Sequence, residues 1–356
     1  MGSALAMSIV VQEARLDLDR GLIVDALHRF LTPYLTPESN ATRFAWLYQA
    51  NPYGAPRVWT ARRSDGGQVI GVASAFPRRL YVREVAEQGW VLGDFCIHPD
   101  YRTLGPAVRL QRVFLEEAEA GRIAFWYDFP NPGMVAVYRR MGLAPTHEVI
   151  RFARPLRLDP KFTAIVRSRR LGALLAAPAN WLLRVGGTRT PARGKLEIET
   201  LHGACGPEFT GLSREIRGRL GLSSERSAEY LNWRFHGDPL HHYEFLTARH
   251  HGSLRGYAVF RLAGSEAHIV DLFGADGAAL MGSLIGAVIA RLRESDVATL
   301  SLPLLSTHPW APVLRRLGFH PRESGPVITG GSYSSAALTH TAEGGPWLLL
   351  DGDRDS

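Results

Sequence analysis

Six consecutive residues at 102–107, Arg-Thr-Leu-Gly-Pro-Ala, form the part of this 356-residue chain best suited to hold an anion. They follow an apolar and aromatic stretch, 90–97, that is typical of a strand; Pro99 ends it, because proline lacks the N–H that a strand ladder needs. A helical pattern then runs to about Gly121. A turn between a strand and a helix directs backbone N–H groups at one point, and the helix dipole adds positive charge there. We therefore expect a phosphate to bind at this turn.

The spacing of this turn matches a known signature. Arg102-x-x-Gly105-x-Ala107 fits the Arg/Gln-x-x-Gly-x-Gly/Ala motif of the GNAT acyltransferase superfamily, and the usual hydrophobic-x-Pro precedes it at 97–99. One departure is Pro106, which has no N–H and removes one donor from the phosphate site. The charge of Arg102 could offset this loss, although a surface salt bridge is its ordinary role.

A second signature follows in the expected order. Asn131, then Tyr138 seven residues later, then the pair at 142–143 fall where GNAT proteins carry Asn, Tyr and Gly-Phe. Met134 stands where the family often has Ala, and the pair reads Gly-Leu. Two signatures in order are much harder to obtain by chance than one. Over residues 42–154 the chain resembles a GNAT domain.

The resemblance implies an α+β fold, an acyl-CoA donor (acetyl-CoA or a longer acyl-CoA) and an amine or amino-sugar acceptor. It also implies direct transfer without a covalent enzyme intermediate and without a metal. The pantetheine arm would lie where the strand through Phe95–Ile97 splays from the next strand. The implied cofactor-binding residues are Phe95, Cys96, Ile97, Arg102, Thr103, Leu104, Gly105, Ala107, Asn131 and Tyr138.

Acyl transfer to an amine needs a base for the nucleophile and a proton for the leaving thiolate. Tyr138 sits where the family often has the general acid or the thiol's hydrogen-bond donor, although a buried core tyrosine is an equally good interpretation. Asp94 is the only carboxylate on the central strand, so we assign it as a candidate base, with His98 as the alternative. Cys96 is interpreted as a small buried hydrophobic residue.

Composition indicates a globular, two-domain protein. Hydrophobic residues make up 46% of the chain and charged residues 21%, and the formal net charge of +7 is compatible with an anionic ligand. Cys96 and Cys205 lie far apart, there is no signal-peptide pattern, and no apolar run reaches the roughly 20 residues that cross a bilayer. We expect a cytoplasmic protein that does not bind nucleic acid.

The order of elements agrees with this fold. Helices are predicted within residues 20–50, followed by a hairpin of strands at 57–62 and 69–75 around an Asp-Gly-Gly turn. An edge segment at 80–85 and the strand 90–97 come next. A helix at 106–119, a strand at 123–127 and a helix at 131–141 complete the pattern.

The chain also repeats itself. Trp46, followed by proline six residues later, returns as Trp233 with the same spacing, and Thr-Ala-Arg occurs fourteen residues after each tryptophan. Arg-Arg-Met-Gly-Leu at 139–143 returns as Arg-Arg-Leu-Gly-Phe at 315–319. We infer a tandem duplication of two GNAT-like domains, each a mixed sheet flanked by helices.

The second copy lacks the chemistry of the first. No Arg-x-x-Gly-x-Gly/Ala motif follows its central strand at 268–273. Asp276, which we expect to be a helix N-cap, would place negative charge at the phosphate position. Counterparts of Asn131 and Tyr138 are missing. We expect one CoA site per chain, in the first copy.

We divide the chain into a first GNAT domain (1–154), a basic and apolar connector (155–195), a degenerate second domain (196–336) and a tail (337–356). The connector pattern at 161–185 fits a helix packed between domains better than a membrane-surface helix. The alternating aspartates at 351–355 are expected to be a solvated terminus rather than a calcium loop. The paired histidines at 241–242 and 250–251 are not expected to bind metal, because neighbours on a strand face opposite ways.

Two other functions remain open: a Fem-type aminoacyl transferase, against which the 102–107 motif argues, and a non-catalytic acyl-CoA-binding or scaffold protein. For the acyltransferase we expect the acceptor site between the two copies. Its walls would come from the Asp94 strand, the Tyr138 helix and part of 225–245, which is rich in aromatic residues.

Overall fold

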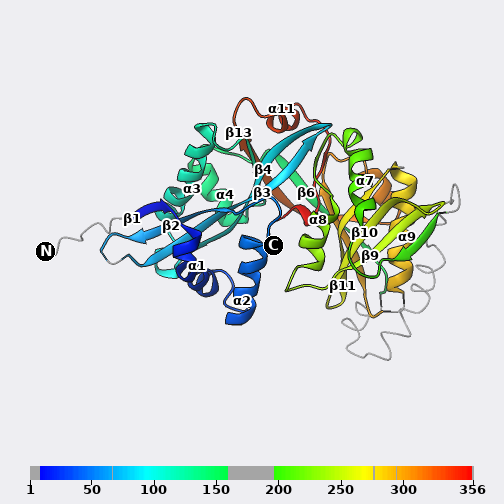
Figure 1. Ribbon diagram of the computed structural model, residues 1–356, viewed down its shortest axis with the longest axis horizontal. Coiled ribbons are helices and arrows are strands. Elements are labelled where there is room, and N and C mark those ends of the chain that lie inside the picture. Colours follow the sequence, from blue (N-terminus) through cyan, green and yellow to red (C-terminus); the bar gives the residue numbers. More distant parts are fainter. Residues whose placement is uncertain (1–8, 66, 159–195, 276, 294, 355–356) are drawn as a thin grey trace.

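The computed structural model describes residues 9–65, 67–158, 196–275, 277–293 and 295–354. The predicted connector helix at 161–185 and the cap at Asp276 lie outside these residues. Two similar α+β units stand side by side, and each has a mixed sheet with helices packed on it (Figure 1). The predicted fold class and the tandem duplication are confirmed.

The first unit follows the predicted order, with a strand added at its start. Its elements are β1 (Ile9–Glu13), α1 (Leu16–Phe30), α2 (Pro37–Phe44), a π-helical turn (Ala45–Gln49), β2 (Arg57–Arg63), β3 (Val69–Val82), β4 (Val85–Ile97), a 3-10 turn (Pro99–Tyr101), α3 (Leu104–Glu119), β5 (Phe125–Asp128), α4 (Pro132–Arg140) and β6 (His147–Pro155). The expected edge segment at 80–85 is the far end of the β3–β4 hairpin.

The second unit repeats this series, and a C-terminal extension follows it. Its elements are β7 (Glu197–Thr200), α7 (Pro207–Ile216), a 3-10 turn (Arg217–Arg219), β8 (Leu222–Ser224), α8 (Ala228–Leu231), a π-helical turn (Asn232–His236), β9 (Glu244–His250), β10 (Ser253–Ala263), β11 (Glu266–Gly274), α9 (Gly277–Leu292), β12 (Thr299–Leu305), α10 (Ala311–Arg316) and β13 (His320–Gly331). The extension comprises α11 (Ala336–Ala342), β14 (Trp347–Leu348) and a 3-10 turn (Asp351–Asp353).

The two units exchange their last strands. β13, from the second copy, lies between β5 and β6 of the first, while β6 lies between β13 and β12 of the second. In the described residues, one continuous sheet of 14 strands results. β13 approaches β5 closely, and a Cβ at Gly331 would collide with the backbone carbonyl of Ala124. The glycine pair at 330–331 therefore permits this pairing.

Alternate residues of the strands in the first unit pack into two different hydrophobic cores, one on each face of the sheet. Val58 and Val72 pack with α1 in a core that continues into the second unit. Their neighbours Trp59 and Ala73 pack on the opposite face with α3. This period of two is what a sheet covered by helices on both faces requires.

The repeated tryptophans occupy equivalent positions at the junction of the copies. The indole N–H of Trp46 donates to the carbonyl of Trp233 at 2.7 Å, and the indole N–H of Trp233 donates to the carbonyl of Trp46 at 3.0 Å. The rings stack with centroids 5.6 Å apart. Both tryptophans lie in the π-helical turns, so the sequence repeat corresponds to a structural one.

The C-terminal tail is not a solvated terminus, and that expectation was wrong. Asp353 is 0% exposed and forms an ion pair with the fully buried Arg226. The backbone carbonyl of Asp353 also accepts a hydrogen bond from Tyr127 of the first copy. The red end of the ribbon accordingly runs between the two units (Figure 1). A buried carboxylate needs a cationic or hydrogen-bonding partner. The partner of Asp353 is Arg226, and the residues next to Asp353 in the sequence do not indicate it.

Among the described residues, no helix combines the length and the apolar character needed to cross a membrane.

Candidate active site

Strands β4 and β5 separate at the centre of the first unit. Their parallel ladder covers only Gly89–Val91 against Phe125–Tyr127. Beyond it, β4 carries a bulge against β3, where Asp94 adopts a φ of 47°. A bulge increases local twist and bends the strand. The end of β4 therefore diverges from β5 and leaves a gap beside Phe95.

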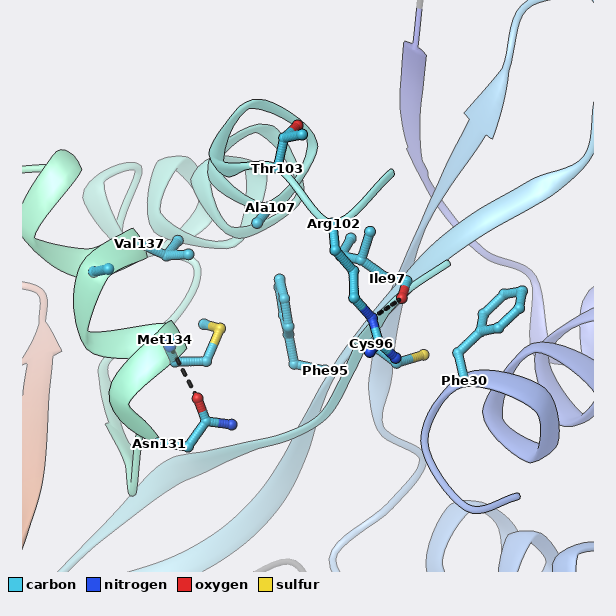
Figure 2. A pocket seen from close by; sticks show the side chains of 12 residues that line it. Phe30, Phe95, Cys96, Ile97, Arg102, Thr103, Ala107, Asn131, Met134 and Val137 are labelled. Carbon is cyan, nitrogen blue, oxygen red and sulfur yellow. Dashed lines mark hydrogen bonds between the residues drawn. The ribbon is translucent and has the colours of Figure 1, made fainter. Parts of the chain in front are cut away.

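A cavity of about 380 Å³ occupies this gap. It lies between the end of β4, the start of α3 and the exposed start of α4, with the end of α1 at its side (Figure 2). Its lining is largely apolar. The lining residues are Phe30, Phe95, Cys96, Ile97, Arg102, Thr103, Ala107, Asn131, Gly133, Met134, Ala136 and Val137.

The cavity includes seven of the ten residues expected to bind the cofactor. Of the other three, Gly105 lies exposed in the first turn of α3, where a Cβ would meet no atom within 4 Å. Leu104 begins α3, and Tyr138 lies elsewhere.

The start of α3 has no side-chain cap. Thr103 occupies the N-cap position, yet its side chain accepts no hydrogen bond from the helix amides. The first amides of a helix have no partner within the helix, so an anion can bind there. Arg102, just before it, donates from Nε to the carbonyl of Ile97 at 3.2 Å, which holds its guanidinium at the end of β4 (Figure 2). Backbone donors and a cation thus lie at one end of an apolar cavity.

The start of α4 differs because it is capped. The side-chain oxygen of Asn131 accepts a hydrogen bond from the amide of Met134 at 3.0 Å (Figure 2). Asn131 therefore fixes the helix that forms one wall of the cavity.

Cys96 lines the cavity but is not suited to nucleophilic attack. Burial, with the negative charge of Asp94 nearby, raises the pKa of its thiol to about 12. The thiol is therefore protonated near neutral pH, whereas thiolate is the reactive form. This agrees with its interpretation as a small buried hydrophobic residue.

Tyr138 lies in the core rather than in the cavity. Its side chain is 0% exposed, and its hydroxyl donates to Asp128 at 2.6 Å and accepts from Gln111 at 3.2 Å. Burial and the negative charge of Asp128 raise the pKa of Tyr138 well above its ordinary value. Leu314 stands at the same point of the repeat and is also buried. A general acid has to reach the leaving thiolate, so this geometry supports the core interpretation of Tyr138.

Asp94 is buried in an ion pair. Arg43 donates to both carboxylate oxygens, at 2.6 and 2.8 Å, and the hydroxyl of Tyr48 donates to Oδ2 at 2.7 Å. The side chain of Asp94 is 2% exposed. Because both oxygens already accept hydrogen bonds from Arg43, proton abstraction would have to break that pair. The geometry therefore argues against Asp94 as the base; its pair with Arg43 ties the bulge of β4 to α2.

His98, the alternative base, packs its ring against Phe30 with centroids 4.9 Å apart. Its Nδ1 accepts a hydrogen bond from the amide of Asp100, which starts the 3-10 turn before α3. His98 therefore has a structural role just before the start of α3.

A second cavity, of about 240 Å³, opens on the other side of Asp94, between the two copies. The strand of Asp94 and residues 238–241 contribute to it, as expected for the acceptor site, but α4 does not. The Arg43–Asp94 pair was missed in the sequence because the two residues are 51 positions apart and belong to no common motif.

Comparisons with known proteins agree with this geometry. Residues 23–143 match the model of the acetyltransferase (GNAT) family. Residues 23–143 are thus similar to that family, and the chain as a whole has the fold of a tandem GNAT protein.

Several solved structures are similar to most of this chain. A probable N-acyltransferase from Enterococcus faecalis, described as a conserved protein of unknown function, is 14% identical with a TM-score of 0.65; the match covers 91% of this chain and 72% of that one. A tandem GNAT protein from the clavulanic acid biosynthesis pathway is 17% identical with a TM-score of 0.56, over 91% of this chain and 98% of that one.

N-myristoyltransferase from Saccharomyces cerevisiae, with bound myristoyl-CoA, is 13% identical with a TM-score of 0.54, over 92% of this chain and 80% of that one. At these identities the similarity concerns the fold. No curated protein sequence matches the chain.

Proposed function

We propose that the protein transfers an acyl group from acyl-CoA, with acetyl-CoA as the first donor to test, directly to an amine, and that the first copy catalyses this step. The observation that carries the proposal is the junction of the β4–β5 gap with the uncapped start of α3 in one cavity. An acyl-CoA has an anionic pyrophosphate and a long, weakly polar arm. The cavity offers amides and a cation at one end and apolar walls along the rest.

Each group in the cavity then has a defined task. The amides at the start of α3, together with Arg102, bind the pyrophosphate. Phe95 and Met134 pack against the arm and exclude water from the thioester. The backbone of β4 beyond Val91, which β5 does not pair with, offers hydrogen bonds to the arm's amides. Holding donor and acceptor in one geometry is a large part of the rate gain available to a direct transfer.

The second copy has no Arg-x-x-Gly-x-Gly/Ala motif after its central strand, which provides a matched control. Gly105 and Ala278 occupy equivalent, exposed positions in the first turns of α3 and α9. We expect Gly105→Glu to weaken CoA binding at least 100-fold, because the carboxylate repels the pyrophosphate and opposes the helix dipole. Ala278→Glu should leave CoA binding within twofold.

Isothermal titration calorimetry of both variants and the parent with CoA and acetyl-CoA measures this difference. Released thiol, followed with a panel of primary amines, measures transfer. Two equivalent CoA sites per chain, or equal effects of the two substitutions, would show that the first copy is not the donor site.

A further inference from the structure

The cavity between the copies adjoins the donor cavity along two segments of chain. Phe95 lines the donor cavity and Asp94 lines the inter-copy cavity. Likewise Phe30, at the end of α1, lines the first, and Leu31 lines the second. The two cavities therefore share two walls, the end of β4 and the end of α1, where neighbouring residues line different cavities. A molecule in the inter-copy cavity would lie next to the end of the donor site.

Both copies contribute side chains to the inter-copy cavity. The first copy supplies the turn after α1, the α2 helix, the π-helical turn after it and the bulge, through Leu31, Thr32, Tyr34, Arg43, Trp46 and Asp94. The second copy supplies one short loop, through Asp238, Leu240 and His241.

Asp238 and His241 form a hydrogen-bonded pair at this wall. The Asp238 side chain is 1% exposed, and its Oδ2 lies 3.0 Å from Nδ1 of His241. Asp238 also accepts hydrogen bonds from the amide of Leu240 at 2.8 Å and from the hydroxyl of Tyr243 at 2.9 Å. Burial opposes ionisation, but the hydrogen bonds from His241, Leu240 and Tyr243 hold the pKa of Asp238 below its ordinary value. An ionised Asp238 accepts the Nδ1 proton and leaves the Nε2 lone pair of His241 as the basic atom.

The same loop in the first copy shows which parts are needed for folding. Asn51 stands at the position of Asp238 in the repeat, and Gly54 at the position of His241. The side-chain oxygen of Asn51 accepts a hydrogen bond from the amide two residues on, at 3.0 Å, as Asp238 does. An asparagine is therefore sufficient to build this turn. The carboxylate and the imidazole add acid–base chemistry that only the second copy's loop has, and this loop faces the first copy's site.

We propose that the inter-copy cavity binds the acceptor as a protonated primary amine, and that His241, positioned by Asp238, removes the proton that prevents attack. This inference rests on the proposed acyl transfer. One proton passes from the ammonium to Nε2 of His241 and then to solvent. The free amine forms a C–N bond with the thioester carbonyl, the C–S bond breaks, and the second proton leaving nitrogen neutralises the CoA thiolate.

The surrounding charges fit this role. Asp94 is neutralised by Arg43, and Arg234 lies 3.9 Å from Asp238. The titratable and charged groups near His241 are Asp238, Arg234, Tyr243 and His242 on its own copy, and Tyr34, Arg43 and Asp94 across the cavity. Of the cavity's two carboxylates, neither has a free path to the acceptor proton, since each already accepts several hydrogen bonds. His241 is the residue on this wall with a basic atom available, because its Nε2 makes no hydrogen bond within the described parts of the chain.

The test compares His241→Gln with His242→Gln, its exposed neighbour outside the cavity. The full-length protein is assayed with acetyl-CoA and three amine probes: spermidine, glucosamine and a tripeptide with a free N-terminus. We expect His241→Gln to lower kcat at least 100-fold for the accepted probe, the usual scale for loss of a general base. It should also remove the loss of rate at acidic pH, while His242→Gln retains both.

Two further variants separate chemistry from binding and folding. Asp238→Asn should keep the turn, as Asn51 shows, and keep the melting temperature, yet lower kcat because the imidazole loses its orienting carboxylate. Leu240→Trp should narrow the cavity and raise KM for the amine with little change in kcat.

Acetyl-CoA binding, measured by calorimetry, should stay within twofold in all four variants. If the unsubstituted protein does not bind acetyl-CoA, the proposed donor site is refuted, whatever the role of His241. Normal binding with unchanged transfer and an unchanged pH profile in His241→Gln would refute the assignment of the base.

Discussion

Asp94 and Asp271 stand at the same position in the two copies, three residues before the end of the splayed strand, and their surroundings differ. Asp94 pairs with Arg43 and borders an open cavity. Asp271 pairs with Arg226 beneath the C-terminal tail. The carbonyl of Gly352 accepts hydrogen bonds from Tyr230 and Arg234, both of the second copy.

The tail thus fills in the second copy the place that corresponds to the inter-copy cavity of the first. A Cβ at Gly352 would lie 2.9 Å from the ring of Phe235 and 3.3 Å from the carbonyl of Val270, so a larger residue here would have to displace the ring or β11. Duplication gave both copies the same strand geometry. The two copies therefore differ in what covers this strand and in what begins the helix after it.

The largest effect should come from separating the copies. Residues 1–195 alone lack β13, which pairs with both β5 and β6, and lack β12, the other neighbour of β6. We expect this fragment not to unfold cooperatively, because β6 would have no partner strand and β5 would become an open edge. Circular dichroism during heating measures this. Mixing the fragment with residues 196–356 should restore a transition, and cooperative unfolding of 1–195 by itself would contradict the importance of the exchange.

The two buried arginines give a smaller, graded effect. Arg226→Met leaves Asp271 and Asp353 without a cation, while Arg43→Met leaves one carboxylate that Tyr48 still hydrogen-bonds. Breaking one buried ion pair lowers the free energy of unfolding by about 3–5 kcal/mol. We expect a loss of about 5 kcal/mol for Arg226→Met and of about 3 kcal/mol for Arg43→Met.

Urea unfolding measures these two costs. Arg29→Met, which removes a surface pair with Asp25, is the control and should change stability by less than about 1 kcal/mol. Equal values for all three would show that burial of these pairs does not matter.

The smallest effect concerns Tyr138, whose counterpart is the core residue Leu314. Tyr138→Phe removes a hydrogen bond to Asp128 and should cost about 1–2 kcal/mol of stability. Acyl transfer should stay within twofold, because the hydroxyl does not reach the cavity. Thiol release under saturating substrates measures it. A 100-fold loss of kcat with normal stability would instead restore Tyr138 as the acid.

The sequence predicted local features well. The turn at 102–107, the strand before it and the helix after it depend on neighbours in the chain, and seven of ten expected cofactor residues line one cavity. The repeat also placed Trp46 and Trp233 correctly, because their spacing to later elements is kept.

Features made by distant residues were not predictable. Arg43 meets Asp94 across 51 residues, and Asp353 meets Arg226 across 127. The signature residue Tyr138 was assigned by position in a motif, but the direction of its side chain depends on Asp128 and Gln111, to which the motif does not refer. The exchange of β6 and β13 leaves each copy's own pattern unchanged, so a single sequence does not reveal it.

The exchanged strands also constrain how this gene can evolve. Once β13 completes the first copy's sheet and β6 the second's, loss of either half removes a central strand from the other. The second copy, which lacks the Arg-x-x-Gly-x-Ala turn, cannot then be deleted without removing a strand from the first. The surface of the second copy can change, while its last strand, β13, has to keep pairing with the first copy's sheet. Loops such as the one bearing His241 could therefore acquire new residues without the duplication being lost.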